Sequence, residues 1–244
     1  MTPLANRREL AWGAGILLGL AALALLPLAT RRDDVLNFVF LILLSITLAE
    51  SWNMLAGYVG QVNLGHAAFF GLGALVARTL WTLGTPILLA MIAGAAAAAV
   101  FALPIGAAAF RLRGAYFAVG TLALGEILRT TVANVLPEIS TQPTGDIGSY
   151  RLSHRYYLAL ALASLSVVMA GLLGASRAGL GMRAIREDED AAEASGVGAL
   201  WLKLFALVLS TGLAGLAGGS SPSITSATTP RMPSVPPGPS TRSS

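Results

Sequence analysis

Long apolar runs dominate the pattern of hydrophobic and polar positions along this chain. A membrane-spanning helix needs roughly 20 consecutive apolar residues, and about seven runs approach that length. They cover residues 10–29, 35–56, 67–83, 87–110, 115–136, 156–175 and 199–219. The pattern predicts an all-α, polytopic transmembrane helix bundle in which the third run either crosses the bilayer or is re-entrant. The first run is long for a signal peptide and no convincing cleavage site follows it, which favours a retained helix.

Composition agrees with a membrane domain. The 244 residues are 55% hydrophobic and 11% charged, whereas soluble domains carry about 25% charge. The net charge of +4 comes from scattered residues, so we expect no nucleic-acid partner and interpret the arginines as juxtamembrane anchors of a chain embedded in a lipid bilayer. The chain has no cysteine, which excludes disulfides and Cys-based metal sites or nucleophiles.

The distribution of arginines predicts an orientation, because cytoplasmic loops of membrane proteins are enriched in Lys and Arg. If the N-terminus is cytoplasmic and every run spans, the loop at 137–155 is external and the charged loop at 176–198 is cytoplasmic. The inside segments then hold Arg7, Arg8, Arg111, Arg113, Arg177, Arg183 and Arg186, and the outside loops hold Arg31, Arg32, Arg151 and Arg155. A re-entrant third run would reverse the assignment upstream of it.

The charged loop is the most polar connection between apolar runs. Residues 180–195 contain good helix formers and are followed by Gly196, a residue typical of helix ends, so the pattern predicts one short helix. Such a helix is either a solvated connector or a docking element for a cytoplasmic partner. Without further information, the residue pattern favours the solvated connector over the docking element.

Charged side chains inside apolar runs usually face protein or water. Glu126 and Arg129 are three residues apart and therefore share a helix face. A structural pair between them is favoured over a polar lining or gate. Arg78, close to Trp81, is expected at the membrane boundary.

Catalytic chemistry finds no support in the sequence. The two histidines, His66 and His154, lie in different segments. There is no nucleophile elbow, metal-ligand spacing or phosphate-binding loop. We therefore expect no catalytic residue, metal or cofactor, and no ATP hydrolysis by this chain.

Three motifs occur in the same order as in a known family. Asp190-Ala191-Ala192 with Gly196 resembles the E-A-A-x-x-x-G loop of ABC-importer permeases, with Asp in place of Glu. The longer stretch at 182–196, together with 57–73 and 112–128, resembles the LivM branch, the permease subunits of branched-chain amino-acid importers.

The resemblance implies a function and a set of partners. It predicts translocation of Leu, Ile or Val across the bacterial inner membrane, together with a second, LivH-type permease, two ATP-binding subunits that hydrolyse the ATP, and a periplasmic substrate-binding protein. The charged loop would then be the ATPase-coupling loop. Its candidate residues are Arg183, Arg186, Glu187, Asp190, Ala191, Ala192, Glu193 and Gly196.

The Gly-rich segment before the third run is the candidate substrate pathway. Irregular backbone at membrane depth is tolerated where it lines a cavity or is buried in protein. In transporters, interrupted helices mark substrate sites, because free helix N-termini attract carboxylates. The candidate residues are Gly60, Gln61, Asn63, Gly65 and His66. The alternative is that these residues only join helices and that the glycines serve close packing.

The C-terminal residues have a different composition. Of the last 25 residues, 18 are Ser, Thr or Pro, which predicts disorder. Members of the resembled family continue here through further membrane helices, and shifting the reading frame of a permitted back-translation gives a string that resembles that continuation. We interpret residues 220–244 as a frameshift product and residues 1–219 as a permease domain that is incomplete at its C-terminus.

Other functions remain open from the sequence. The related urea or short-amide importer branch is a close alternative. An ion-coupled secondary transporter would need intramembrane carboxylates, for which only Glu126 and Glu50 are candidates. A non-transporting scaffold, or a non-functional truncated membrane protein, is the third possibility.

Overall fold

The computed structural model describes residues 19–30, 32–112, 114–135 and 152–221. Within these ranges the secondary structure is helical, which confirms the predicted fold class. After a helical segment at Gly19–Ala29, the elements are α2 (Asp33–Val59), α3 (His66–Thr82), α4 (Ile87–Ala109), α5 (Ala115–Val135), α7 (Leu152–Ala175), α8 (Arg177–Glu187), α9 (Glu189–Ala194) and α10 (Ala199–Gly219).

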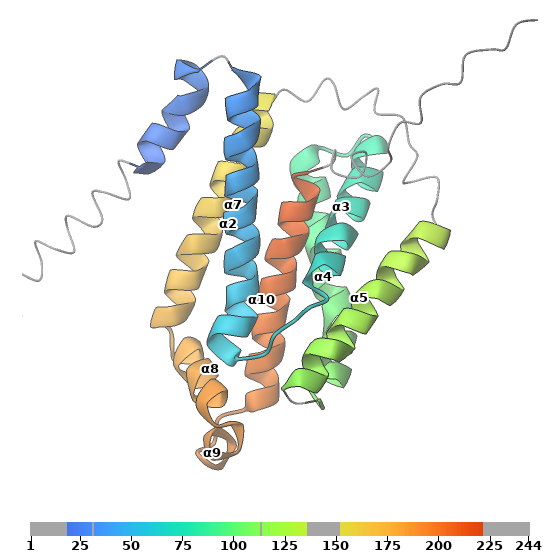
Figure 1. The fold of residues 1–244 in the computed structure, drawn as a ribbon, viewed down its shortest axis with the longest axis vertical. Helices are drawn as coiled ribbons and strands as arrows, with labels where there is room; N and C mark the ends of the chain where they lie inside the picture. Colours follow the sequence, from blue (N-terminus) through green and yellow to red (C-terminus); the bar gives the residue numbers. More distant parts are fainter. Residues whose placement is uncertain (1–18, 31, 113, 136–151, 222–244) are drawn as a thin grey trace, which may run out of the picture.

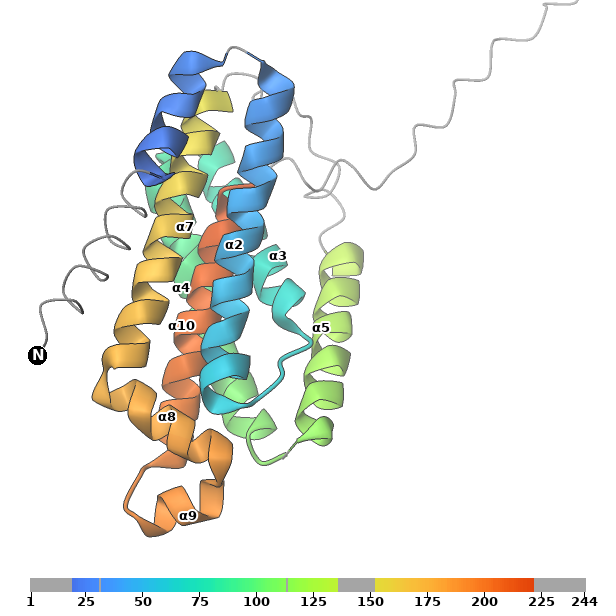
Figure 2. The same cartoon turned by 60° about the vertical axis from the view of Figure 1, so that its left-hand side comes forward.

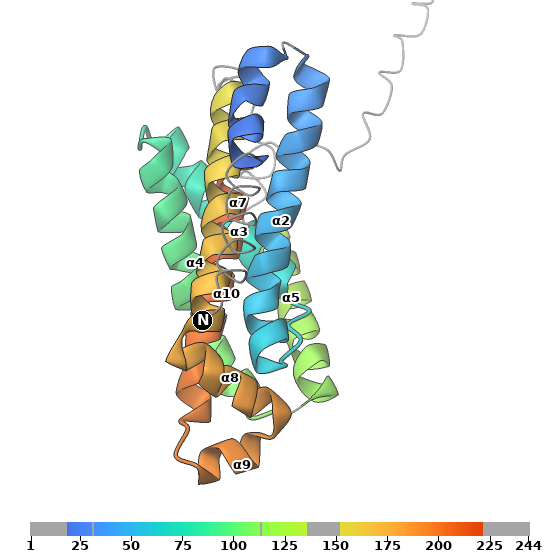
Figure 3. The same cartoon turned by 90° about the vertical axis from the view of Figure 1, so that its left-hand side faces the viewer.

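The long helices form a bundle around α10 (Figures 1 and 2). Helix α10 packs most extensively against α4 and α3 and then against α2, while α7 packs on the other side of α2. Helix α5 lies at the edge of the bundle, where its main contacts are with α3 and α4. Helices α8 and α9 lie together at one end, as the turned view also shows (Figure 3).

Glycines allow α3, α4 and α10 to touch through their backbones. A Cβ atom added at Gly73 of α3 would lie 2.3 Å from the carbonyl oxygen of Gly215 in α10. One added at Gly94 of α4 would lie 2.5 Å from the carbonyl oxygen of Gly73. Small residues at helix contacts permit this close approach in membranes. The chain therefore needs glycine at the level where these three helices meet.

Four helices in the described part of the chain are long and apolar enough to cross a membrane: α2, α4, α7 (over His154–Ala175) and α10. Helix α3 has 17 residues and spans only about 25 Å at 1.5 Å per residue. Helix α5 carries two charges, and much of the first apolar run lies outside the described residues. Spanning by these three runs stays a prediction.

The third run does not turn back on itself within the bundle. From the end of α2, residues 60–65 extend from the α8–α9 end of the bundle to about its mid-height, where α3 begins (Figure 1). Helix α3 then continues to the end opposite α8 and α9, where α4 starts. The irregular segment and α3 together run from the α8–α9 end of the bundle to the opposite end.

Two predicted loops differ from the structure. Helix α7 already begins at Leu152, inside the loop expected at 137–155. The helix expected at 180–195 is divided in two, because Asp188 adopts an extended conformation (φ −156°, ψ 110°) between α8 and α9. Its carboxylate accepts a hydrogen bond from the Ala191 N–H (3.0 Å), which is how an Asp starts a new helix.

The predicted C-terminal tail falls largely outside the described residues. Helix α10 ends at Gly219, and Ser220 and Ser221 behind it are buried. Residues 222–244 are not among those that the structure describes.

Candidate functional site

The polar segment between α2 and α3 starts at a glycine that ends α2. Gly60 has φ 78°, a left-handed conformation that strongly favours glycine. In the next five residues the side chains alternate between two environments. Gln61, Asn63 and Gly65 are buried, whereas Val62 and Leu64 are exposed. The segment therefore turns its polar side chains inwards and its apolar side chains outwards, the reverse of a soluble loop.

Hydrogen bonds hold this segment between α2 and α5. Asn63 Oδ1 accepts from the Gly65 N–H (3.0 Å), and the Asn63 carbonyl accepts from Trp52 Nε1 (3.3 Å). The Leu64 N–H donates to Thr121 Oγ1 (3.1 Å). A Cβ atom at Gly65 would lie 2.3 Å from the Thr121 carbonyl oxygen. The position therefore needs glycine because α5 lies directly against the start of α3.

Three buried polar atoms of this region have no hydrogen-bond partner in the described structure: Gln61 Oε1, Asn63 Nδ2 and His66 Nδ1. Buried polar atoms are nearly always paired, and each unpaired one destabilises a protein by about 1–3 kcal/mol. For Asn63 the bond from Gly65 N–H fixes which amide atom is the oxygen, so the unpaired atom is the nitrogen. The segment thus has unused hydrogen-bonding capacity.

The ring of His66 is oriented by two serines. Ser51 Oγ donates to the Ser210 carbonyl (3.0 Å) and lies 2.7 Å from His66 Nε2. A hydroxyl has one proton, so His66 Nε2 donates to Ser51. Nδ1 is then the ring atom without a partner. This network joins α2, α3 and α10.

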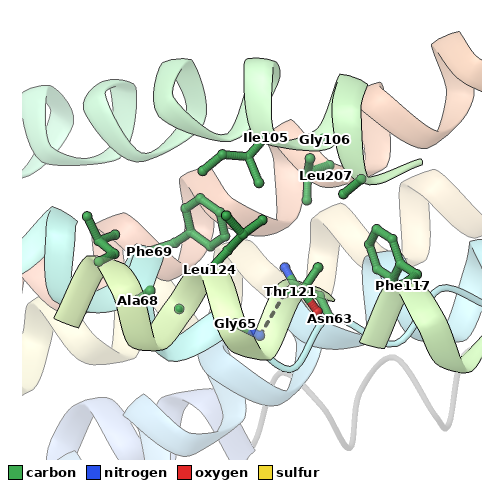
Figure 4. Close-up of a pocket in the computed structure, with 13 residues that line it drawn as sticks. Asn63, Gly65, Ala68, Phe69, Ile105, Gly106, Phe117, Thr121, Leu124 and Leu207 are labelled. Carbon is green, nitrogen blue, oxygen red and sulfur yellow. Dashed lines mark hydrogen bonds between the residues drawn. The ribbon is translucent and has the colours of Figure 1, made fainter. Parts of the chain in front are cut away.

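A small cavity borders the segment (Figure 4). Its volume is about 20 Å³, which is room for about one water molecule. Asn63 and Gly65 are in its wall, whereas Gly60, Gln61 and His66 are not. The remaining wall is mostly apolar and is formed by Ala68, Phe69, Ile105, Gly106, Ala109, Phe117, Thr121, Leu124, Gly125, Leu128 and Leu207. The five predicted pathway residues are therefore adjacent in the chain but do not all line one cavity.

The charged loop packs one face on the bundle and exposes the other. In α8, Gly179, Met182 and Ile185 are buried, three residues apart as on one helix face. In α9, Ala192 is buried. The exposed coupling-loop candidates are Arg183, Arg186, Glu187, Asp190, Ala191, Glu193 and Gly196. Gly196 has φ 85° and follows α9, which confirms the predicted stop signal. The exposed face of α9 is acidic.

Three cationic side chains attach this loop to the bundle. Arg183 donates to the Gly174 carbonyl at the end of α7 and lies over the Tyr58 ring (5.8 Å to the centroid). Arg186 Nη1 donates to the Gly57 carbonyl near the end of α2 (2.8 Å). Lys203 of α10 pairs with Glu189 of α9. The two arginines among the predicted coupling residues thus contact the membrane helices.

The charged residues inside the apolar runs differ in their burial. Glu126 and Arg129 form a bidentate pair on the exposed side of α5, with 2.9 Å between Arg129 Nε and Glu126 Oε2. The predicted mutual pairing is confirmed. Arg78 is buried in the last part of α3.

Sequence reasoning missed Thr121, Ser51, Ser210 and Lys203 as site residues. Thr121 lies within one of the three resembling motifs, and Lys203 is the single lysine of a 21-residue apolar helix. A charged residue in such a helix usually has a specific role, so Lys203 carried a usable signal. The two serines had none, because isolated serines are common in membrane helices.

Comparisons with known proteins agree with these features. The family model described as "Branched-chain amino acid transport system / permease component" matches residues 34–236. The chain is 29% identical to the high-affinity branched-chain amino acid transport system permease protein LivM of Salmonella typhimurium, and 30% identical to the protein of that name from Escherichia coli. Each match covers 78% of this chain and 52% of the relative, so the chain spans about half the length of these curated relatives. No solved structure matches.

The apolar helices and the permease relatives make this a multi-pass membrane protein. By name, the relatives are permease proteins of a transport system. The family match extends over most of the described helices, including the interrupted α2–α3 crossing and the charged loop. The chain belongs to the family of branched-chain amino acid transport system permease components.

Proposed function

We propose that this chain is a membrane-spanning permease subunit of an ABC importer for branched-chain amino acids in the bacterial inner membrane. The family match carries the proposal. The partners in this proposal are a second, LivH-type permease, two ATP-binding subunits and a periplasmic substrate-binding protein. The permease domain is residues 1–219, with the end of α2 and helices α8 and α9 on the cytoplasmic side.

The interrupted crossing is the proposed contact with the substrate. Helix α3 starts at about mid-height of the bundle, and its N-cap residue Gly65 has no side chain to bind the free N–H groups of the first turn. The positive end of a helix dipole favours a carboxylate. Unpaired Asn63 Nδ2 and Gln61 Oε1 can bind the polar groups of an amino acid, and the cavity wall beside Asn63 is apolar, as Leu, Ile or Val would require.

The cavity has room for one water and not for an amino acid, so the pathway is closed at this level. Opening requires α5 to move away from the start of α3. Two observations support such a movement. Helix α5 packs less extensively than the central helices, and its contact with the segment depends on one side-chain hydrogen bond and on the small residues Gly65 and Gly125.

The exposed acidic face of α9 is the proposed docking site for an ATP-binding subunit. Asp190 and Glu193 are exposed there, while Ala192 fixes the helix to the bundle. Charge complementarity would then require a basic groove on the ATPase. The coupling residues of this face are Asp190, Ala191, Glu193 and Gly196.

Uptake of labelled leucine tests the proposal in a strain that lacks its own branched-chain importers and receives this chain with its neighbouring transport genes. We expect ATP-dependent uptake that survives an uncoupler. Asn63→Ala and Gly65→Val should abolish it while the complex still co-purifies. Val62→Ala, on the exposed side of the same segment, is the matched control and should retain uptake.

The outcomes separate the parts of the proposal. Normal uptake with both Asn63→Ala and Gly65→Val would exclude the segment from the pathway. Uptake of urea or short amides in place of leucine would reassign the substrate. Loss of uptake on addition of an uncoupler, with ATP present, would indicate an ion-coupled carrier. Absence of any uptake by the unchanged chain would refute the transport function.

A further inference from the structure

Arg186 caps the end of α2 from another helix. Its Nη1 donates to the Gly57 carbonyl over 2.8 Å. The last four carbonyls of a helix have no partner within the helix, and the last turn of α2 contains no basic residue of its own. A cation at this end also complements the negative end of the helix dipole. Glu187 Oε1 accepts from Arg186 Nη2 (2.9 Å) and so orients the guanidinium.

The alkyl chain of Arg186 contacts the glycine at which α2 ends. A Cβ atom added at Gly60 would lie 2.7 Å from Arg186 Cγ. Arg186 therefore contacts both ends of the last turn before the polar segment. Its own helix is fixed to the bundle by buried Met182 and Ile185, so a displacement of α8 carries Arg186 with it.

The other two cationic contacts differ from this one. Arg183 binds the end of α7 through the Gly174 carbonyl and meets the last turn of α2 only at the Tyr58 ring, and Glu189 connects α9 to α10 through Lys203. Of the three, Arg186 is the one that hydrogen-bonds to the backbone of the turn from which residues 61–65 continue. Arg186 thus contacts the membrane helices, whereas Asp190 and Glu193 of α9 are exposed.

We propose that Arg186 is the positioning residue that links movement of α8 and α9 to the polar segment at 60–65. The inference rests on the proposed transport function for the source of the movement. When the ATP-binding subunits displace the loop, the guanidinium pulls on the Gly57 carbonyl and its alkyl chain presses on Gly60. The segment then shifts relative to α5.

The absence of cysteine gives a direct test. Leu64 is 48% exposed, so Leu64→Cys places the single thiol of this chain on the outer side of the segment. In the assembled importer, maleimide labelling of this thiol is measured without nucleotide and after trapping with ATP and vanadate. We expect a several-fold change in the labelling rate that is lost in Arg186→Ala, although ATP hydrolysis continues.

Two control variants separate positioning from charge or general stability. Arg177→Ala removes an exposed charge from the start of the same helix and should keep the full change. Arg186→Lys keeps a donor and should restore part of it. An unchanged response in Arg186→Ala, an equal loss in Arg177→Ala, or no response in Leu64→Cys alone would overturn the inference. If labelling responds as expected but no leucine is taken up, the transport proposal fails and the link stands.

A second measurement needs no partner subunit. In the purified chain, backbone amides of residues 60–65 should exchange hydrogen several-fold faster in Arg186→Ala than in Arg177→Ala, since the last turn of α2 has lost its cap. Equal exchange in the two variants would overturn the role of Arg186, whatever the chain transports.

Discussion

Lys203 and Glu189 form an ion pair between α10 and α9 in which the two side chains differ in burial. The Lys203 side chain is 1% exposed and that of Glu189 is 20% exposed. The ammonium also lies 5.9 Å from the centroid of the Phe110 ring at the end of α4. The charge of the buried lysine therefore depends on the ion pair for its stabilisation more than the charge of the partly exposed glutamate does.

This asymmetry predicts different effects of the two charge removals. Glu189→Gln leaves a buried ammonium without a counter-charge and should destabilise the protein by about 3 kcal/mol. Lys203→Met keeps the buried chain length, and the remaining carboxylate can reach water, so its effect should be smaller. Thermal unfolding in detergent, followed by tryptophan fluorescence, measures both. A larger loss in Lys203→Met would contradict the prediction.

Two glycines of α3 give a matched pair. Gly73→Ala introduces a Cβ atom 2.3 Å from the Gly215 backbone, and overpacking of this kind destabilises by about 1–3 kcal/mol. Gly71→Ala meets nothing within 4 Å and should be neutral or slightly stabilising, because Ala is a better helix former. Thermal unfolding of the two variants compares them directly. Similar unfolding temperatures would show that the α3–α10 contact is looser than the structure indicates.

The hydroxyl of Thr121 should control the local stability of the polar segment. Thr121→Val removes the acceptor of the Leu64 N–H and should destabilise the local structure by about 1 kcal/mol. Hydrogen exchange at the Leu64 amide should become faster by the factor that corresponds to this loss of free energy. Thr121→Ser retains the hydroxyl and is the control. Equal exchange rates in the two variants would mean that this hydrogen bond does not hold the segment to α5.

The charge pair on α5 should matter for insertion. Glu126→Ala or Arg129→Ala leaves one charge unpaired in an apolar helix, which is unfavourable in a bilayer. Each single change should lower the amount of protein in the membrane fraction. The exchanged pair, Glu126→Arg with Arg129→Glu, should restore it, because the i, i+3 spacing is kept. Failure of the exchange to restore insertion would mean that each charge has its own partner.

The sequence predicted helix positions well, because bilayer thickness fixes the length of an apolar run. The runs at 87–110 and 199–219 agree with α4 and α10 to within one residue at each end. The break at Asp188 was missed, because its neighbours are good helix formers and its role depends on a single cap. The pathway candidates were predicted from composition, and the structure shows that Asn63 and Gly65 line the cavity.

The contacts between distant segments could not be predicted. The Arg186–Gly57 hydrogen bond joins residues 129 positions apart, and no periodicity in the sequence relates them. The same holds for Ser51 and Ser210. Such pairs depend on how helices are placed beside one another, which the apolar pattern leaves undetermined.

The backbone contact among Gly73, Gly94 and Gly215 has a mechanical consequence. The three helices are held together at this level by their backbones, without side chains between them. Lys203 lies twelve residues before Gly215, a lever arm of about 18 Å at 1.5 Å per residue. We expect a displacement of the α9 end of α10 to reach α3 and α4 at this level, because no flexible side chain lies between the three backbones.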